Sequence, residues 1–334
     1  MALLSLAQAG HQAVAVVDES LSKQPLSTAT ASDAIPESVN NIELVAATGS
    51  SFKSLRRKVY SGCDRTLVIA PEMDGILQST LKWCRKHGIQ TCNAGNEFVL
   101  RASDKMATAK ALRRHDIPHP PTRLLSRAHQ RWLDKINGKL FSQSGQEPIW
   151  VVKPRWGVGC DGIVRTTSGK IPALCKRSRA FARSDDWVVQ PWLPGRAVSR
   201  AAIFDNVGRP HWLPVTEQHL SITDTVRYCG GVVEPKLQNQ MPELADMLAR
   251  AARALGPECR GWIGFDFLFD ECHALQPLTL IEINPRLTTS FVGLCAAGAA
   301  ELAGSIVSAC CGQPLHLPSS WQRAHFTVNT NATH

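Results

Sequence analysis

Residues 278–294 of the chain read LTLIEINPRLTTSFVGL. The stretch opens with apolar and β-branched residues, which predicts a strand. Because strand side chains alternate between two faces, Glu282 and Asn284 point the same way. Pro285 ends the strand, since proline has no N–H to donate to a sheet. A carboxylate and an amide oxygen beside Arg286 can hold a divalent cation and the phosphate it carries, and the alternative is an edge strand with a solvated polar face.

A second run, WIGFDFLFD at 262–270, precedes this strand. Its phenylalanines alternate with other residues, among them Asp266, which again predicts a strand. The intervening CHALQP is short enough for a hairpin, and antiparallel pairing would place Asp266 beside the face that carries Glu282 and Asn284. Two carboxylates and an amide oxygen on adjacent strands suit Mg²⁺ that is held partly by nucleotide phosphates.

The composition is that of a globular protein. The chain has 334 residues, of which 44% are apolar and 19% charged, and it is long enough for two or three domains. Lysine and arginine number 37 against 28 aspartates and glutamates, which gives a net charge of +9. This balance fits a site for polyanionic small molecules, and since no nucleic-acid motif accompanies the basic residues, we expect no nucleic-acid partner.

The eleven cysteines are irregularly spaced and form no C-x-x-C motif. The N-terminal MALLSLAQAG lacks the positive charge of a signal peptide, and no apolar run reaches transmembrane length. We therefore expect reduced thiols in a cytoplasmic protein that does not enter a membrane.

The first hundred residues alternate between strand and helix patterns. A helix is expected near residues 1–10, strands at 13–19, 42–46 and 66–70, a loop at 20–40, and a helix at 76–87. This order predicts a small parallel sheet. We expect the first strand and the glycine-rich turn of such a domain to be missing before Met1. Glu72 follows an expected strand, where it is either a ligand of the sheet edge or a helix N-terminal acid.

Two lysines are candidates for contacts with phosphate. Ser103 or Asp104 can cap a helix, and Lys105 then lies in its first turn, where the helix dipole disfavours it unless an anion is near; a solvated lysine is the alternative. An apolar strand at 149–152 leads into Lys153. A short loop with three glycines follows and can lie over phosphates, although hairpins also use glycine for turns. These glycines are Gly157, Gly159 and Gly162.

Further along, WVVQPWLPGRAVSRAAIF predicts two strands that are joined by a link. The link can present backbone groups to a planar base, while the Trp192 side chain is expected in the core. The candidates are Gln190, Pro191, Trp192 and Leu193. Residues 222–235 predict a substrate-facing loop with Arg227 and the Gly230–Gly231 pair, and residues 241–255 predict an amphipathic helix. The end of the chain is polar.

In this order and spacing, the motifs resemble the ATP-grasp superfamily over nearly the whole chain. They are SDK at 103–105, VVKP and its glycines from 151, QPWLPG at 190–195, and Asp266 followed by EINPR at 282–286. The resemblance implies an α/β and α+β protein with the ATP-grasp fold. A shortened N-terminal parallel-sheet domain at 1–102 would precede an ATP-grasp domain at 103–312, with subdomains at about 103–190 and 191–312, and a polar tail at 313–334.

The resemblance also implies an activity, in which ATP converts a carboxylate to an acyl phosphate and an amine then displaces phosphate. Lys105 and Lys153 would contact the ATP phosphates under the 157–162 loop, and residues 190–193 would hold adenine. Mg²⁺, or Mn²⁺ in its place, would be bound by Asp266, Glu282 and Asn284. Arg286, together with Lys153, would stabilise the transferring phosphoryl group.

Within the superfamily, IAPEMDGIL at 69–77, YCGGVVEP at 228–235 and EINPRLTTSFVGL look most like tyramine–glutamate ligase of methanofuran biosynthesis, in one-carbon metabolism. That likeness implies glutamate and tyramine, or tyrosine, as substrates. It makes Glu72, Arg227 and Gly231 candidates for substrate binding, and it leaves a homodimer open. A ligase for another acid and amine, or a nucleotide-binding protein that has lost catalysis, are the alternatives.

Overall fold

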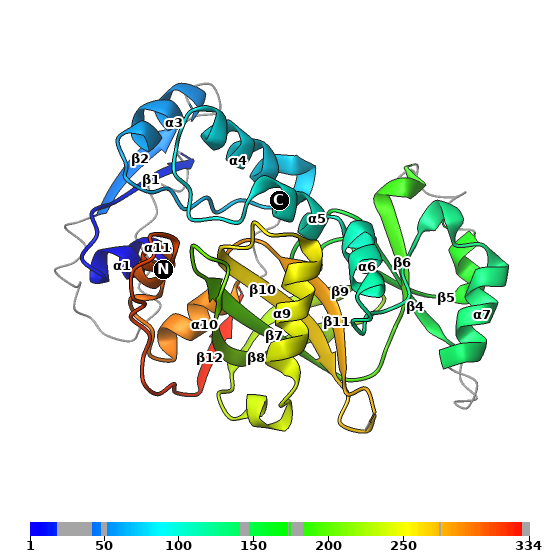
Figure 1. The fold of residues 1–334 in the computed structure, drawn as a ribbon. Coiled ribbons are helices and arrows are strands. Elements are labelled where there is room, and N and C mark those ends of the chain that lie inside the picture. Colours follow the sequence, from blue (N-terminus) through cyan, green and yellow to red (C-terminus); the bar gives the residue numbers. More distant parts are fainter. Residues whose placement is uncertain are drawn as a thin grey trace.

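The computed structural model describes residues 1–18, 42–47, 52–140, 147–172, 174, 183–273 and 275–328. The strands of these residues form three sheets (Figure 1). One is a parallel pair, one has four strands in the order β3-β6-β4-β5, and one has six in the order β11-β10-β7-β8-β9-β12. The four- and six-stranded sheets are antiparallel throughout.

The N-terminal part confirms most of the expected order of elements. Its elements are α1 (Ala2–Gln8), β1 (Ala13–Asp18), β2 (Ile42–Ala47), α3 (Phe52–Ser61), the 3-10 helix η2 (Met73–Gly75), α4 (Ile76–Lys86) and α5 (Asn96–Ser103). β1 and β2 pair in parallel. The loop expected at 20–40 lies outside the described residues.

The strand expected at 66–70 is wrong. Thr66 makes a single parallel bridge with Thr91, and no ladder follows it. Instead, the side chain of Asn93 takes both backbone groups of Val68: its Oδ1 accepts from Val68 N at 2.8 Å and its Nδ2 donates to Val68 O at 2.9 Å. The Asn93 side chain thus makes the backbone hydrogen bonds that a neighbouring strand would make. Glu72 therefore follows a segment without regular secondary structure.

The four-stranded sheet forms a subdomain with its own core. Its elements are α6 (Lys105–Arg114), β3 (Arg123–Leu124), η3 (Leu125–Arg127), α7 (Gln130–Leu140), β4 (Ile149–Pro154), β5 (Val164–Thr167), η4 (Ser168–Lys170), η6 (Ser184–Asp186) and β6 (Trp187–Pro191). α7 covers the sheet at the right of Figure 1. Its Leu133 packs in one cluster with Trp150, Val152 and Val189 of the strands.

The six-stranded sheet is covered on both faces. Its elements are β7 (Arg196–Phe204), β8 (Pro210–Ile222), β9 (Val226–Val233), η7 (Leu237–Gln240), α9 (Leu244–Leu255), β10 (Gly261–Phe269), β11 (Leu278–Asn284), α10 (Ser290–Ala296), α11 (Leu302–Cys310) and β12 (Ala324–Thr327). α9, within the helix expected at 241–255, packs on Phe265 and Phe267, and it crosses the front of the sheet in Figure 1. α10 and α11 pack on the face that carries Ile203 and Trp262.

The loop expected at 222–235 is wrong, because residues 226–233 form strand β9. Within the expected polar tail, residues 324–327 form the edge strand β12, which pairs with β9. The glycines serve this close pairing. A Cβ on Gly230, whose φ is 120°, would collide with the backbone at Phe326, and one on Gly231 would collide with Glu217 O. Within the described residues, no helix combines the length and apolar character needed to cross a membrane.

Candidate active site

A cavity of about 450 Å³ lies between the two antiparallel sheets. The four-stranded sheet contributes Val151, Lys153 and Gln190, and the six-stranded sheet contributes Ala197, Ser199 and Asp266. Ala197 and Ser199 alternate with the core residue Val198, so the cavity lies on the face of β7 opposite α9. The polar and charged candidates from the sequence that line it are Lys153, Gln190, Asp266, Glu282, Asn284 and Arg286.

The expected hairpin of β10 and β11 is confirmed, with Asp266 directly opposite Glu282. Asn284 Nδ2 donates to Asp266 Oδ2 at 2.8 Å, and Gln218 Nε2 donates to Asp266 Oδ1 at 2.9 Å. Burial, reinforced by the Glu282 charge, raises the pKa of Asp266 to about 7. A cation bound close to these two carboxylates would favour their charged forms.

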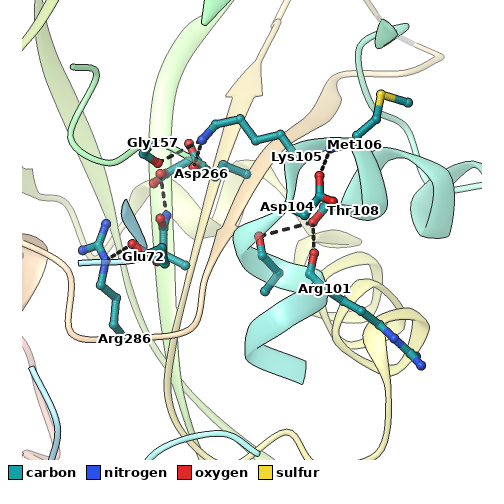
Figure 2. A network of polar contacts seen from close by, with 12 residues as sticks. Glu72, Arg101, Asp104, Lys105, Met106, Thr108, Gly157, Asp266 and Arg286 are labelled. Carbon is teal, nitrogen blue, oxygen red and sulfur yellow. Dashed lines mark hydrogen bonds and ion pairs between the residues drawn. The ribbon is translucent and has the colours of Figure 1, made fainter. Parts of the chain in front are cut away.

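Two buried lysines face Glu282. Lys105 Nζ lies 2.9 Å from Glu282 Oε1 and donates to Gly157 O at 2.9 Å (Figure 2). Burial lowers the pKa of Lys153 to about 8, and Glu282 acts against that shift. Burial alone would raise the pKa of Glu282, but Lys105 and Lys153 together hold it below its ordinary value. Glu282 and the two lysines therefore form a cluster of opposite charges that is largely shielded from solvent.

Lys105 is positioned by the residue before it. Of the two expected caps, Asp104 is the one that caps α6, since its Oδ1 accepts from Met106 N at 2.9 Å and Ala107 N at 3.2 Å. The same carboxylate accepts two bonds from Arg155, Nε at 2.7 Å and Nη2 at 2.6 Å. Asp104 thus joins the start of α6 to the glycine loop, and Glu282 supplies the anion that a lysine in the first turn requires.

The glycine loop connects β4 and β5. Gly159 and Gly162 have φ of 61° and 69°, and Cys160 between them has the same left-handed backbone, with φ of 66°. Gly159 and Cys160 line the cavity. Gly157 lies beside Lys105, and a Cβ there would press on Pro154 at 3.1 Å. The loop therefore covers the lysine end of the cavity, where it was expected to cover phosphates.

The link between the sheets lines the other end. Gln190, Pro191, Trp192 and Leu193 all border the cavity. Gln190 is buried and its Nε2 donates to Thr122 Oγ1 at 2.8 Å. The expected core position of the Trp192 side chain is wrong: the indole is half-buried at the cavity, with the Arg165 guanidinium 4.6 Å from its centroid.

Arg286 forms an ion pair with Glu72 of the N-terminal part, with 2.6 Å between Nε and Oε2 (Figure 2). Glu72 is 6% exposed, and its neighbour Pro71 lines the cavity together with Arg286. The other two residues that were expected to bind substrate do not line the cavity. Arg227 is exposed on β9, Gly231 is buried within the sheet, and neither is among the described residues that line the cavity.

Several polar residues of the cavity wall were not predicted from the sequence. They are Ser199, Gln218, Tyr228, Thr288, Thr289 and Ser290. Ser199 stands between Val198 and Arg200, and Gln218 stands in the polar run Thr216–His219, so neither is marked by its neighbours as a cavity residue. Their relation to Asp266 depends on the strand order β10-β7-β8, which local patterns do not contain.

Comparison with known proteins gives three kinds of match. The family model for the ATP-grasp domain matches residues 102–290. The chain is 25% identical over 228 residues to the D-alanine–D-alanine ligase of Sphingopyxis alaskensis, which covers 65% of this chain and 67% of that protein.

Solved structures give the third match. A biotin carboxylase from Campylobacter jejuni in complex with β-γ-ATP has a TM-score of 0.69 and 18% identity, covering 96% of this chain and 70% of that one. The biotin carboxylase domain dimer of Hydrogenobacter thermophilus 2-oxoglutarate carboxylase, in complex with MgADP, ADP and bicarbonate, has a TM-score of 0.67 and 14% identity, covering 96% of this chain and 68% of that one. At these identities, the likeness shows a shared fold.

Proposed function

Because the chain belongs to the ATP-grasp family, whose domain model matches more than half of it, we propose that it is an ADP-forming ligase that joins a carboxylate to an amine. One observation carries the proposal: a buried lysine, two carboxylates and an arginine line one cavity between two sheets, and a second buried lysine pairs with one of these carboxylates. Buried charges are costly to keep, and a cluster of them at a cavity is typical of a functional site. The alternative of a protein without catalysis is disfavoured because both carboxylates and Arg286 are present at the cavity.

The reaction needs charge neutralisation more than proton transfer. A carboxylate oxygen of the acid attacks the γ-phosphorus of ATP, the bond to the ADP oxygen breaks, and an acyl phosphate forms. The amine nitrogen then attacks the acyl carbon, loses a proton to water, and phosphate leaves with the bonding electrons. Lys105 and Lys153 hold the phosphates through both steps, and Arg286 stabilises the phosphoryl group in transit.

The residues of β10 and β11 fit a magnesium ion. Asp266 and Glu282 offer carboxylate oxygens, and Asn284 Oδ1 is available because its Nδ2 already donates to Asp266. Two carboxylates and an amide are a hard-oxygen set that leaves the remaining positions to phosphate oxygens and water. When bound, the ion would neutralise phosphate charge. Lys105, which lies 2.9 Å from Glu282, would be close enough to contact the same phosphates.

For the substrates, we propose glutamate as the acid and tyramine or tyrosine as the amine. The likeness of residues 69–77, 228–235 and 282–294 to tyramine–glutamate ligase supports this choice. So does the Glu72–Arg286 pair, which offers an anion and a cation to an amino acid at the cavity. The apolar side chains of Ile69, Pro71 and Leu287 can pack on an aromatic amine. The relative from Sphingopyxis alaskensis favours a second candidate, the joining of two D-alanines.

The test supplies the purified protein with Mg²⁺, ATP and one pair of substrates at a time: glutamate with tyramine, glutamate with tyrosine, and D-alanine alone. ADP release and product mass are followed in the same reaction. We expect an amide and equimolar ADP with one pair. Lys153→Met should abolish both, whereas Lys170→Met, at an exposed lysine of η4, should leave both unchanged. ADP without an amide in every pairing, or equal turnover by Lys153→Met, would refute the proposal.

A further inference from the structure

Arg165 lies on β5 and has no part in the chemistry described above. The strand register places it opposite Val151, which in turn lies opposite Gln190 on β6. Residues directly opposite one another on neighbouring strands point to the same face of a sheet. Since Val151 and Gln190 line the cavity, the Arg165 side chain belongs to the cavity face of the four-stranded sheet.

Arg165 also holds the turn between β8 and β9, which belongs to the other sheet. Its backbone N–H donates to Asp224 O at 2.9 Å, and its Nη1 donates to Thr223 O at 3.0 Å. Next to it, Val164 forms an antiparallel bridge with Thr225. These contacts connect the two sheets directly, in addition to the covalent link at 192–195.

The turn held in this way is part of the cavity wall. Leu220 on one side of it and Val226 on the other both line the cavity. The tip itself is exposed, and Ile222 keeps 45% of its surface open to solvent, so little apolar packing secures it. Release of the Arg165 contacts would therefore free the tip to move away from the cavity.

The guanidinium of Arg165 makes a third contact, with the ring of Trp192. Its central carbon lies 4.6 Å from the ring centroid, within the range of a cation–π interaction. Its Nε–H is buried and meets no hydrogen-bond acceptor in the described part of the chain. The charged group therefore packs on one side of a ring that itself borders the cavity, and this contact restricts the orientation of the ring.

We propose that Arg165 is a positioning residue for nucleotide binding, which fastens the β8–β9 turn over the cavity and fixes the Trp192 ring where the base is held. The inference rests on the proposed function in one respect, since it takes the ligand of this cavity to be ATP or ADP. A latch of this kind slows the escape of a bound nucleotide.

The test measures the kinetics of a fluorescent N-methylanthraniloyl derivative of ADP with Mg²⁺ and without acid or amine. Arg165→Gln removes the charge and the stacking, and Arg165→Lys keeps the charge without the planar fork. Arg131→Gln, at an exposed arginine of α7 in the same subdomain, is the matched control. We expect release to be about tenfold faster for Arg165→Gln and about threefold faster for Arg165→Lys, and unchanged for Arg131→Gln.

Trypsin provides a second readout, because Arg227 lies just beyond the turn on β9. The Arg165→Gln variant should be cut after Arg227 about tenfold faster than the parent and the control, with unchanged cutting at the other sites that all three proteins share. Equal release rates in all four proteins, or uniformly faster cutting throughout the chain, would overturn the inference. If Arg165→Gln fails to fold, Arg165→Lys decides by the same two rates. A parent protein that binds the nucleotide but forms no amide would refute the ligase and leave the latch intact.

Discussion

Replacement of Glu282 by glutamine tests the charge cluster most directly. The change keeps the shape of the side chain but removes the anion that lies 2.9 Å from Lys105 Nζ. It also removes the group that raises the pKa of Lys153 against burial. The pKa of Lys153 is already about 8, so it should fall further in the variant, and a neutral lysine would hold phosphate poorly at pH 8.

The size of the effect follows from the same geometry. Removal of one partner from a fully buried ion pair costs about 3–5 kcal/mol of stability. The Glu282 side chain is 24% exposed, so we expect the free energy of unfolding to fall by about 2 kcal/mol. Turnover should fall on the order of 10³-fold, because a preorganised charge and a metal ligand are lost together.

Urea denaturation measures the free energy of unfolding, calorimetry measures the binding of MgADP, and steady-state kinetics measure turnover. Glu271→Gln is the matched control, since this glutamate pairs with Arg196 at 2.8 Å but is 52% exposed. Its stability should change by less than about 0.5 kcal/mol. The reasoning fails if Glu282→Gln binds ADP with an undiminished dependence on Mg²⁺, because Glu282 would then be neither a metal ligand nor the counter-ion of the lysines.

Three further changes test the fold around the site. Cys160→Gly should raise the free energy of unfolding, measured in urea, by about 0.5–1 kcal/mol, because glycine tolerates the left-handed backbone there. Gly230→Ala should lower it by about 3 kcal/mol, because its Cβ would collide with Phe326 O and force β12 away. Asp205→Asn should lower it by about 1–2 kcal/mol at pH 7. Although burial opposes it, hydrogen bonds from the backbone and from Arg209 lower the pKa of Asp205, so its contribution is full above the unfolded pKa of about 4 and disappears as the pH falls through the folded pKa.

Each of these changes has an outcome that would count against it. For Cys160→Gly it is a loss of stability. Gly10→Ala controls for Gly230→Ala, because Gly10 has a φ of 82° with open space around it, and an equal cost at both positions would deny the close approach of β12. For Asp205→Asn, a stability difference from the parent that persists below pH 2 would mean that the carboxylate charge is not its source.

The hairpin that carries Asp266 and Glu282 was predictable because both of its strands alternate and its connection is short. The approach of Glu72 to Arg286 was not, since 214 positions separate them and their contact depends on how the N-terminal part packs. The role of Asp104 as a helix cap could be predicted from the local sequence. Its bonds to Arg155 could not, because Arg155 lies 51 positions away, in the connection between β4 and β5.

The errors share a physical cause, which is that a distant partner decided the conformation. Gly230 and Gly231 are typical of a loop until β12 requires a flat, close neighbour. The apolar run 66–70 is typical of a strand until Asn93 satisfies the backbone of Val68. In both cases, tertiary contacts override local preference.

The contact of Lys105 with Glu282 means that a cation at the proposed metal site would replace the lysine beside this carboxylate. The ammonium group is an internal counter-ion that keeps the carboxylate charged. A divalent cation on its own would have to compete with this tethered cation, whose local concentration is very high. A cation bound to a polyphosphate would bring a new partner for the displaced lysine, so the exchange would leave no charge unpaired. A site of this kind would favour the nucleotide complex of the metal over the free metal.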